Sequence, residues 1–251
     1  MTTIDAMVPN REVRAEMLSP AELDTAVSEF PLAYLPLGSL EFHGPHLPIG
    51  LDALNAHGVC IGAARITGGI VLPPVFQGIG GEHSAYPWTI MMRSDTEIRS
   101  HLVQTLTRLE AFGVHDAVLF TGHFAGEQQE MIDTIAAVWN EEAGHQLHVI
   151  ATGVNRCPSC PIPPDHAGIF ETSLLHALHP ELVHLDRLPL ANAGPAVDPD
   201  GDTMGPQRHD PSHPLWGIFG PDPRTLDIES SGLVLDALVA WLAGMARNRG
   251  M

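Results

Sequence analysis

The segment Val114-His-Asp-Ala-Val-Leu-Phe-Thr121-Gly122-His123-Phe-Ala-Gly126 decides the expected fold. Its residues up to Thr121 form a short, largely apolar run, which is typical of a strand buried inside a sheet. Gly122 allows a sharp turn, and the residues from Gly126 to Glu142 have helical periodicity that ends near Gly144. A buried strand that leads into a helix is typical of a βαβ unit, so this segment predicts a parallel sheet.

The same alternation of strands and helices continues on both sides of this segment. Further strands are expected at Ala33–Gly38, Ile70–Leu72 and Gln146–Thr152. Further helices are expected at Leu54–Ile66, Phe170–Leu178 and Ser230–Arg247, and from a Ser94/Glu97 capping box to about Phe112, with Gly113 as the stop. The pattern predicts an α/β fold in which helices cover both faces of a mostly parallel sheet. A long Pro-, Gly- and Asp-rich loop is expected at Asn192–Thr225.

Length and charge limit the classes of function. The chain has 251 residues, which fits a single domain spanning residues 1–251. It carries 12 Lys+Arg against 30 Asp+Glu, so its formal net charge is −18. That charge disfavours binding to nucleic acid or to an anionic membrane, because both need a positive protein surface. The acidic surplus and the 15 His suit divalent cations, although a solvated acidic surface explains the same composition.

The N-terminal region and the cysteines indicate a cytoplasmic protein. Residues Met1 to Pro20 contain no apolar core of a signal peptide, and no run of about 18 apolar residues is present. The odd number of cysteines fits a reducing compartment. Cys157 and Cys160 lack both the second pair of a zinc site and the surroundings of a thioredoxin-like redox site, so their role stays open.

A dense group of metal-ligand side chains follows the first predicted strand. The run Glu41-Phe-His43-Gly-Pro-His46-Leu-Pro-Ile-Gly-Leu-Asp52 holds carboxylates and imidazoles but no Lys or Arg. Glu41 and His43 point to the same side of an extended chain. A bend at Gly44-Pro45 can bring His46 and Asp52 back toward them. Because open α/β sheets bind ligands at the carboxyl ends of their strands, this run predicts a metal site.

Three further segments carry candidate functional residues. His123 follows a buried strand, and His166 and Glu171 lie at the start of a short predicted helix. Each has a structural alternative, since His123 can be a satisfied strand-end histidine and Glu171 can stabilise a helix dipole. The third segment supplies candidate substrate-binding residues, whose aromatic members can equally be packing groups: Gly81, Glu82, His83, Tyr86 and Trp88.

These segments resemble the creatininase (creatinine amidohydrolase) family along nearly the whole chain. The run from Glu41 to Asp52 is similar to the family pattern E-x-H-G-P-H-L-P-x-x-x-D, and Thr121-Gly-His123 to the start of its N-G-H-G-G-N segment. His166-Ala-Gly-Ile-Phe-Glu171-Thr-Ser resembles H-A-G-x-x-E-T-S, and Glu82-His83 with Tyr86-Pro-Trp-Thr resembles E-H-x-x-F-P-G-T. Gly217-Ile-Phe-Gly220 is similar to its G-V-W-G region. The resemblance implies a three-layer α/β/α sandwich and a homo-oligomer, often a hexamer.

The resemblance also implies two divalent metal ions, zinc or manganese, with iron as a further choice. Glu41, Asp52 and His123 would hold one ion, and Asp52 would bridge to a second ion that His43 also binds. Creatininase itself takes its last ligand for the second ion two residues after the strand-end His, where this chain has Ala125. We expect Glu171 to complete that site, with Glu127 as the weaker alternative. Three carboxylates and one bridging hydroxide would balance two divalent ions, and a single ion would leave buried charge unpaired.

The implied activity is metal-dependent hydrolysis in which His166 acts as general acid/base. The position four before His166, where creatininase has a tryptophan, is Ile162, so a different substrate is expected. The favoured reaction is cleavage of a non-peptide C–N bond in a small polar amide, linear or cyclic. Hydrolysis of a keto-inositol, cyclic ketone or lactone is one alternative. A metal-binding family member without catalysis is the other.

Overall fold

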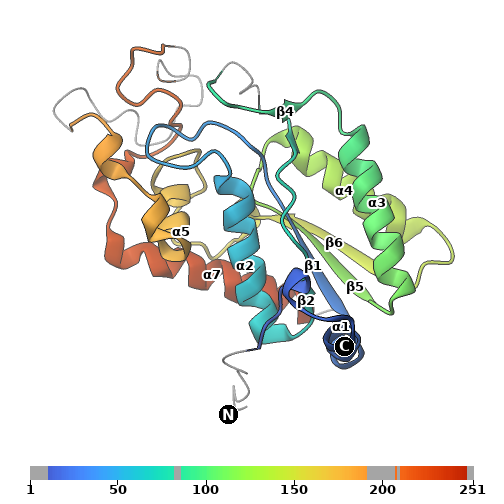
Figure 1. Ribbon diagram of the computed structural model, residues 1–251. Coiled ribbons are helices and arrows are strands. Elements are labelled where there is room, and N and C mark those ends of the chain that lie inside the picture. The colour runs from blue at the N-terminus through green and yellow to red at the C-terminus, as the bar shows by residue number, and fades with distance from the viewer. Residues whose placement is uncertain (1–10, 82–85, 191–206, 208–209, 248–251) are drawn as a thin grey trace.

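A computed structural model describes residues 11–81, 86–190, 207 and 210–247 (Figure 1). Its main sheet has four parallel strands in the order β2-β1-β5-β6. These strands are β1 (Leu32–Leu37), β2 (Ile70–Val71), β5 (Asp116–Thr121) and β6 (His148–Gly153). A separate parallel pair joins β3 (Gly78–Ile79) to β4 (Met91–Met92).

Helices cover both faces of the main sheet, as Figure 1 shows. One layer contains α2 (Leu51–Thr67), α5 (Ile169–Leu178) and α7 (Ser231–Arg247), which pack against one another. The other layer contains α1 (Pro20–Glu29), α3 (Thr96–Ala111) and α4 (Gly126–Glu141). The expected three-layer α/β/α sandwich is therefore confirmed.

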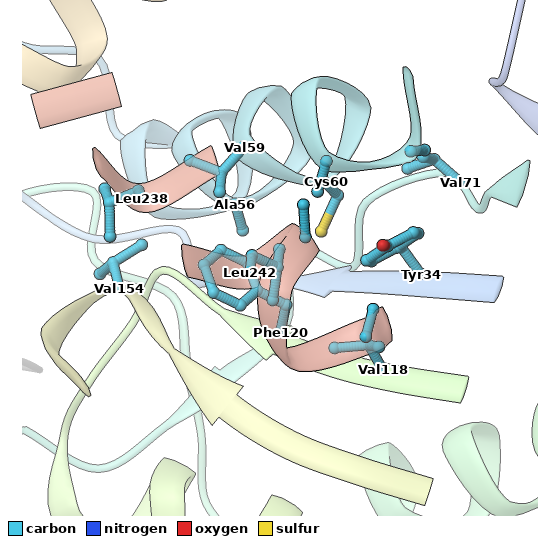
Figure 2. Close-up of a cluster of buried hydrophobic side chains, with 14 of the residues drawn as sticks. Tyr34, Ala56, Val59, Cys60, Val71, Val118, Phe120, Val154, Leu238 and Leu242 are labelled. Carbon is cyan, nitrogen blue, oxygen red and sulfur yellow. The ribbon is translucent and has the colours of Figure 1, made fainter. Parts of the chain in front are cut away.

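The two cores follow from the alternation of side chains along each strand. In β1, Tyr34 faces the α2/α7 layer, whereas Ala33 and Leu35 face the α3/α4 layer. Figure 2 shows the first core, in which Phe120 from β5 lies close to Leu242 from α7. Burying an apolar side chain of this size contributes about 1.5–3 kcal/mol, so these clusters hold the layers together.

Short 3₁₀ helices connect the larger elements. They are η1 (Ala15–Met17), η3 (Val154–Arg156), η4 (Pro180–Leu182), η5 (Leu185–Arg187), η6 (Pro223–Thr225) and η7 (Ile228–Ser230). The last two lie at the end of, and just beyond, the expected Asn192–Thr225 loop. Residues 192–206 and 208–209 of that loop fall outside the described part.

Two helix starts differ from expectation. α2 begins at Leu51, with Gly50 as its N-cap, so Asp52 lies in a helix rather than in a loop. α3 begins at Thr96 with Asp95 as its N-cap, so the Ser94/Glu97 capping box is wrong. Those two side chains still meet, because Ser94 Oγ donates to Glu97 at 3.2 Å.

The helix α1 was not expected from the pattern. Its sequence does hold a start signal, since Pro20 is its first residue and the Glu22 carboxylate accepts from the Ser19 N–H at 2.8 Å. Only Ala26 and Val27 of this helix are buried. So short an apolar stripe is difficult to recognise by periodicity.

By length and composition alone, the segment Ile228–Arg247 could cross a membrane. Its residues Val234, Leu238 and Leu242 are fully buried in the core against α2 and the sheet. One face of α7 thus packs in the core, while other apolar residues of the segment, such as Leu233, are exposed.

Candidate metal centre

The strand register brings the ends of β1 and β5 to one edge of the sheet. Leu37 pairs with Thr121, so Gly38 and Gly122 leave the sheet side by side. The first turn of α2 lies directly against both glycines. A Cβ at Gly38 would lie 2.1 Å from the Ala53 nitrogen, and one at Gly122 would lie 2.0 Å from the Asp52 carbonyl oxygen. Glycine at both positions therefore lets α2 place Asp52 between the two strand ends.

Five predicted ligand residues converge at this edge, and all are buried: Glu41, His43, Asp52, His123 and Glu171. Glu41 and His43 follow β1, Asp52 lies in the first turn of α2, His123 follows β5, and Glu171 lies in the first turn of α5. Their ligand atoms form overlapping groups of three within 4.8 Å, and Asp52 belongs to two of the groups.

The first group consists of Glu41, Asp52 and His123. His123 Nδ1 lies 2.9 Å from Glu41 Oε1 and 3.3 Å from Asp52 Oδ2. The Ser39 hydroxyl donates to the same Asp52 Oδ2 at 2.7 Å and fixes that carboxylate. Ser39 thus supports the site by orienting a candidate ligand.

The second group consists of His43, Asp52 and Glu171. His43 Nε2 lies 3.2 Å from Asp52 Oδ1 and 3.5 Å from Glu171 Oε2. His43 Nε2 and Asp52 Oδ1 are both buried, and neither has a hydrogen-bond partner among the described residues. Two unpaired polar atoms that face each other in a buried site are costly unless a cation or a proton lies with them.

The backbone contacts of both imidazoles indicate which nitrogen faces the carboxylates. His43 Nδ1 lies 3.0 Å from the Glu41 carbonyl oxygen, and His123 Nε2 lies 3.2 Å from the Ile79 carbonyl oxygen. A carbonyl oxygen only accepts, so these nitrogens carry the N–H. The opposite nitrogens, Nε2 of His43 and Nδ1 of His123, then face the carboxylates, where either a bound cation or a proton would lie between them. Metal-binding histidines have this arrangement, so the residues fit a cation site.

The electrostatics agree with a site that requires positive charge. Burial lowers the pKa of His43, but Asp52 and Glu171 outweigh it and raise that pKa to about 10. The pKa of His123 is also raised, because Glu41 and Asp52 outweigh its burial. Burial raises the pKa of Glu171 well above its usual range. Without a metal, protons would have to occupy the place of the missing cations.

Glu171 is held by a strained turn. Its Oε2 accepts from the Ala167 N–H at 2.6 Å, and Ala167 has a φ of +57°. The buried Asp165 carboxylate accepts from the Gly168 and Phe170 N–H groups at 3.0 and 2.9 Å and caps the start of α5. The strain at Ala167 aims its N–H at the carboxylate.

His46 lies behind the site rather than in it. Its Nε2 lies 3.2 Å from the Thr172 hydroxyl, next to Glu171 in α5. Burial lowers the pKa of His46 to about 3, so its imidazole is neutral. The bend at Gly44-Pro45 therefore leads His46 to α5 and only the later Asp52 to the centre.

His166 stands over the second group. Its ring stacks on His43 with centroids 4.4 Å apart, and Phe219 covers it at 5.2 Å. His166 Nε2 lies 3.1 Å from the Phe42 carbonyl oxygen, which makes Nε2 the donor and leaves Nδ1 as its basic nitrogen. His166 also has a ligand atom within 4.8 Å of ligand atoms of Glu41 and His43, so these three residues could hold a metal ion.

The remaining predicted residues lie around the centre or outside the described part. Tyr86 is buried and contacts Phe42 and Trp216, with ring centroids 5.7 and 5.1 Å apart. Gly81 has a φ of +84°, and Trp88 is 80% exposed. Glu82 and His83 fall among the residues that the structure does not describe.

Glu127 does not join the ligand groups of the described residues. It is exposed, and its carboxylate lies against Gly80. Among the same residues, no group of side chains that could hold a metal ion contains a cysteine. Cys157 packs into the core instead. The aromatic residues Phe42 and Phe219 were missed by sequence reasoning, although Phe42 stands between two predicted ligands.

Comparison with known proteins matches this chain to one family. Residues 16–245 match the Creatininase family, described as creatinine amidohydrolase. A mycofactocin precursor peptide peptidase of Mycobacterium ulcerans is 31% identical over 182 residues, which cover 68% of each chain. Creatinine amidohydrolase of Pseudomonas putida is 29% identical over 238 residues, which cover 85% of this chain and 88% of that protein.

Solved structures give the same result. A crystal structure of creatinine amidohydrolase (creatininase) matches with a TM-score of 0.75 and 25% identity, covering 96% of this chain and 98% of the other. A creatininase Mn structure and a mutant of Zn-Zn type share the fold, with TM-scores of 0.75 and 0.73 at 24% identity. They cover 95% and 96% of this chain and 99% of each of those chains. The chain therefore belongs to the creatininase family of hydrolases.

Proposed function

We propose that this protein is a metal-dependent hydrolase that cleaves an amide C–N bond. The observation that carries the proposal is the pair of imidazoles whose outer nitrogens donate to backbone carbonyls while their inner nitrogens face three buried carboxylates. Glu41, Asp52 and His123 would hold one divalent ion, and His43, Asp52 and Glu171 would hold the second. When bound, such ions polarise a substrate carbonyl and make water a nucleophile near neutral pH.

The chain's own residues would supply proton transfer and orientation. His166 keeps its Nε2–H on the Phe42 carbonyl, so its Nδ1 is the nitrogen that can move a proton to the leaving nitrogen. Its stacking between His43 and Phe219 fixes the plane of the ring. Glu171, held by Ala167, would complete the second ion and keep a carboxylate at the reacting centre.

The proposed substrate is a small polar amide. A peptide is the second candidate, because the M. ulcerans relative at 31% identity is named a peptide peptidase. The relatives with solved metal forms make zinc and manganese the first ions to test. Residence in the cytoplasm, a single domain and assembly into a homo-oligomer remain predictions.

A metal-loading screen tests the proposal. The protein is stripped with a chelator, reloaded with Zn²⁺ or Mn²⁺, and offered linear and cyclic amides, short peptide amides, lactones and cyclic ketones. We expect metal-dependent release of an amine from an amide, and loss of that release in His166→Ala with the metal content retained. Full metal loading without turnover on any compound would instead support a non-catalytic metal-binding protein.

A further inference from the structure

Two non-glycine residues in the described part of the chain have a positive φ, Trp88 at +59° and Ala167 at +57°. Positive φ is unfavourable for a bulky L-residue because of its Cβ. Ala167 has a visible reason for this conformation, since its N–H holds Glu171. Trp88 has no comparable reason within the fold, because its side chain is 80% exposed and gains little packing.

The turn that carries Trp88 is of the kind that favours glycine. Tyr86, Pro87, Trp88 and Thr89 form a turn closed by the Thr89 N–H and the Tyr86 carbonyl oxygen at 3.4 Å. Proline at the second position and positive φ at the third are the features of a type II turn. In such a turn the third residue is normally glycine, whereas here it is tryptophan, which has the largest side chain of the amino acids.

The turn is fastened to the segment that supplies the candidate ligands. The Phe42 N–H donates to Thr89 Oγ1 at 3.0 Å, and the Ile90 N–H donates to the Leu40 carbonyl oxygen at 2.7 Å. Phe42 lies between Glu41 and His43. The Trp88 Cα is therefore within about 9 Å of the Phe42 backbone, given the 3.8 Å spacing of consecutive Cα atoms.

We infer that Trp88 is a specificity-determining residue that packs against an apolar or planar group of the substrate, beyond the scissile bond. The inference rests on the proposed function and narrows its substrate to an extended, peptide-like amide. The exposed indole extends from a turn that is bonded to the ligand segment, and it offers a rigid face for stacking and apolar contact. A substrate no larger than the metal centre would not reach it.

The first test uses N-acetyl-triglycine amide and its three variants with one Phe in place of each Gly in turn. The wild-type enzyme is expected to prefer one Phe-containing peptide over the all-Gly peptide in kcat/KM. Trp88→Gly should reduce that preference about tenfold, as for a buried aromatic contact, and Trp88→Phe should retain most of it. Phe112→Ala, which removes another exposed aromatic side chain at the C-cap of α3, is the matched control and should keep the preference.

Thermal unfolding separates this role from a structural one. Trp88→Gly should raise Tm by about 2–4 °C, because glycine adopts positive φ without strain. A variant that gains stability and loses preference fits a residue retained for binding. A fall in Tm would show that the indole is needed by the fold, and would overturn the inference.

Tryptophan fluorescence tests whether a peptide contacts Trp88 even if no peptide is hydrolysed. The difference between wild type and Trp88→Phe isolates the Trp88 emission, which acrylamide should quench readily in the metal-loaded protein. The Phe-containing peptide should protect it and the all-Gly peptide should not. Turnover of small amides only, with no protection, overturns the inference and leaves the proposed function standing. Protection that depends on protein concentration alone would assign Trp88 to a contact between copies of the chain, which also overturns it.

Discussion

His43 Nε2 and Asp52 Oδ1 lie 3.2 Å apart in a fully buried site, and neither atom has a hydrogen-bond partner in the part of the chain that the structure describes. The other oxygen of Asp52 lies 3.3 Å from His123 Nδ1. One carboxylate thus connects the two groups of candidate ligands. Its two oxygens face different imidazoles. A substitution in one ligand group should therefore remove a different metal ion from a substitution in the other group.

Metal content should divide according to this geometry. His43→Ala and His123→Ala should each lower the content of the loaded protein from about two ions to about one ion per chain, because each removes one ligand from one group. Asp52→Asn should lower it below one, because it weakens both groups. Elemental analysis after gel filtration measures this, with the exposed His101 changed to Ala as control. Equal loss in all three variants would contradict separate groups.

Glu171 and Glu127 are the two candidates for the last ligand of the second ion, and the same substitution at each compares them. Glu171→Gln should lower kcat/KM by about 10–100-fold or more, since it removes a buried ligand charge. Glu127→Gln should change it less than about twofold, because an exposed carboxylate against Gly80 reaches no ligand group of the described residues. The reverse order of effects would restore Glu127 as the ligand.

Removal of the metal should destabilise the fold. Three buried carboxylates, Glu41, Asp52 and Glu171, lose their counter-charge in the chelated protein. Adding Zn²⁺ or Mn²⁺ at about 100 times its Kd should increase the free energy of unfolding by about 2.7 kcal/mol for each ion bound. Urea unfolding measures the change, and the gain should vanish in Asp52→Asn. A gain of equal size in that variant would place the stabilising ion elsewhere.

The glycines at the strand ends should not tolerate a side chain. Gly38→Ala and Gly122→Ala place a Cβ against the α2 backbone at 2.1 and 2.0 Å, so each should cost about 1–3 kcal/mol or more of unfolding free energy and reduce metal content. Gly244→Ala in α7 is the control, because its Cβ meets nothing within 4 Å. That change should stabilise the protein by about 0.5–1 kcal/mol. If Gly244→Ala lowered the stability while Gly38→Ala and Gly122→Ala did not, the close approach of α2 to the strand ends would not explain these glycines.

Glu110 should contribute stability that depends on pH. Its carboxylate accepts from the Leu147 N–H at 3.0 Å and from His145 Nδ1 at 2.9 Å, and these bonds, with the Leu147 contact first, lower its pKa below 4.5. A lowered pKa means that the stability is present above about pH 4.5. It is lost as pH falls through the lower, folded-state value.

The variant Glu110→Gln tests the direction of this pH dependence. Near neutral pH it should lower the free energy of unfolding by about 1 kcal/mol, the typical loss for a weakened charged hydrogen bond. The difference from wild type should shrink as pH falls below 4.5, measured by urea unfolding at several pH values. Glu130→Gln on the exposed face of α4 is the control. A difference that grows toward acid would mean that Glu110 binds its proton more tightly in the folded chain.

The sequence predicts most of the sheet because its central strands are continuous apolar runs. β5 was expected at 114–121 and occurs at Asp116–Thr121. The ligand residues could be named because strand ends of a parallel sheet meet at one edge. Their grouping came from the family resemblance and not from the residues alone, since it depends on the helix start at Leu51 and on the turn at Ala167. Both are set by contacts between segments distant in sequence.

The pairing of Leu37 with Thr121 has a consequence for folding. A slip of β1 by one residue would move its end by about 3.3 Å along β5 and turn its side chains to the opposite face. Glu41 and His123 would then no longer meet at one ion. Bound metal would therefore stabilise the native register of β1 and β5 over the slipped one, and so would add to the free energy that specifies the sheet.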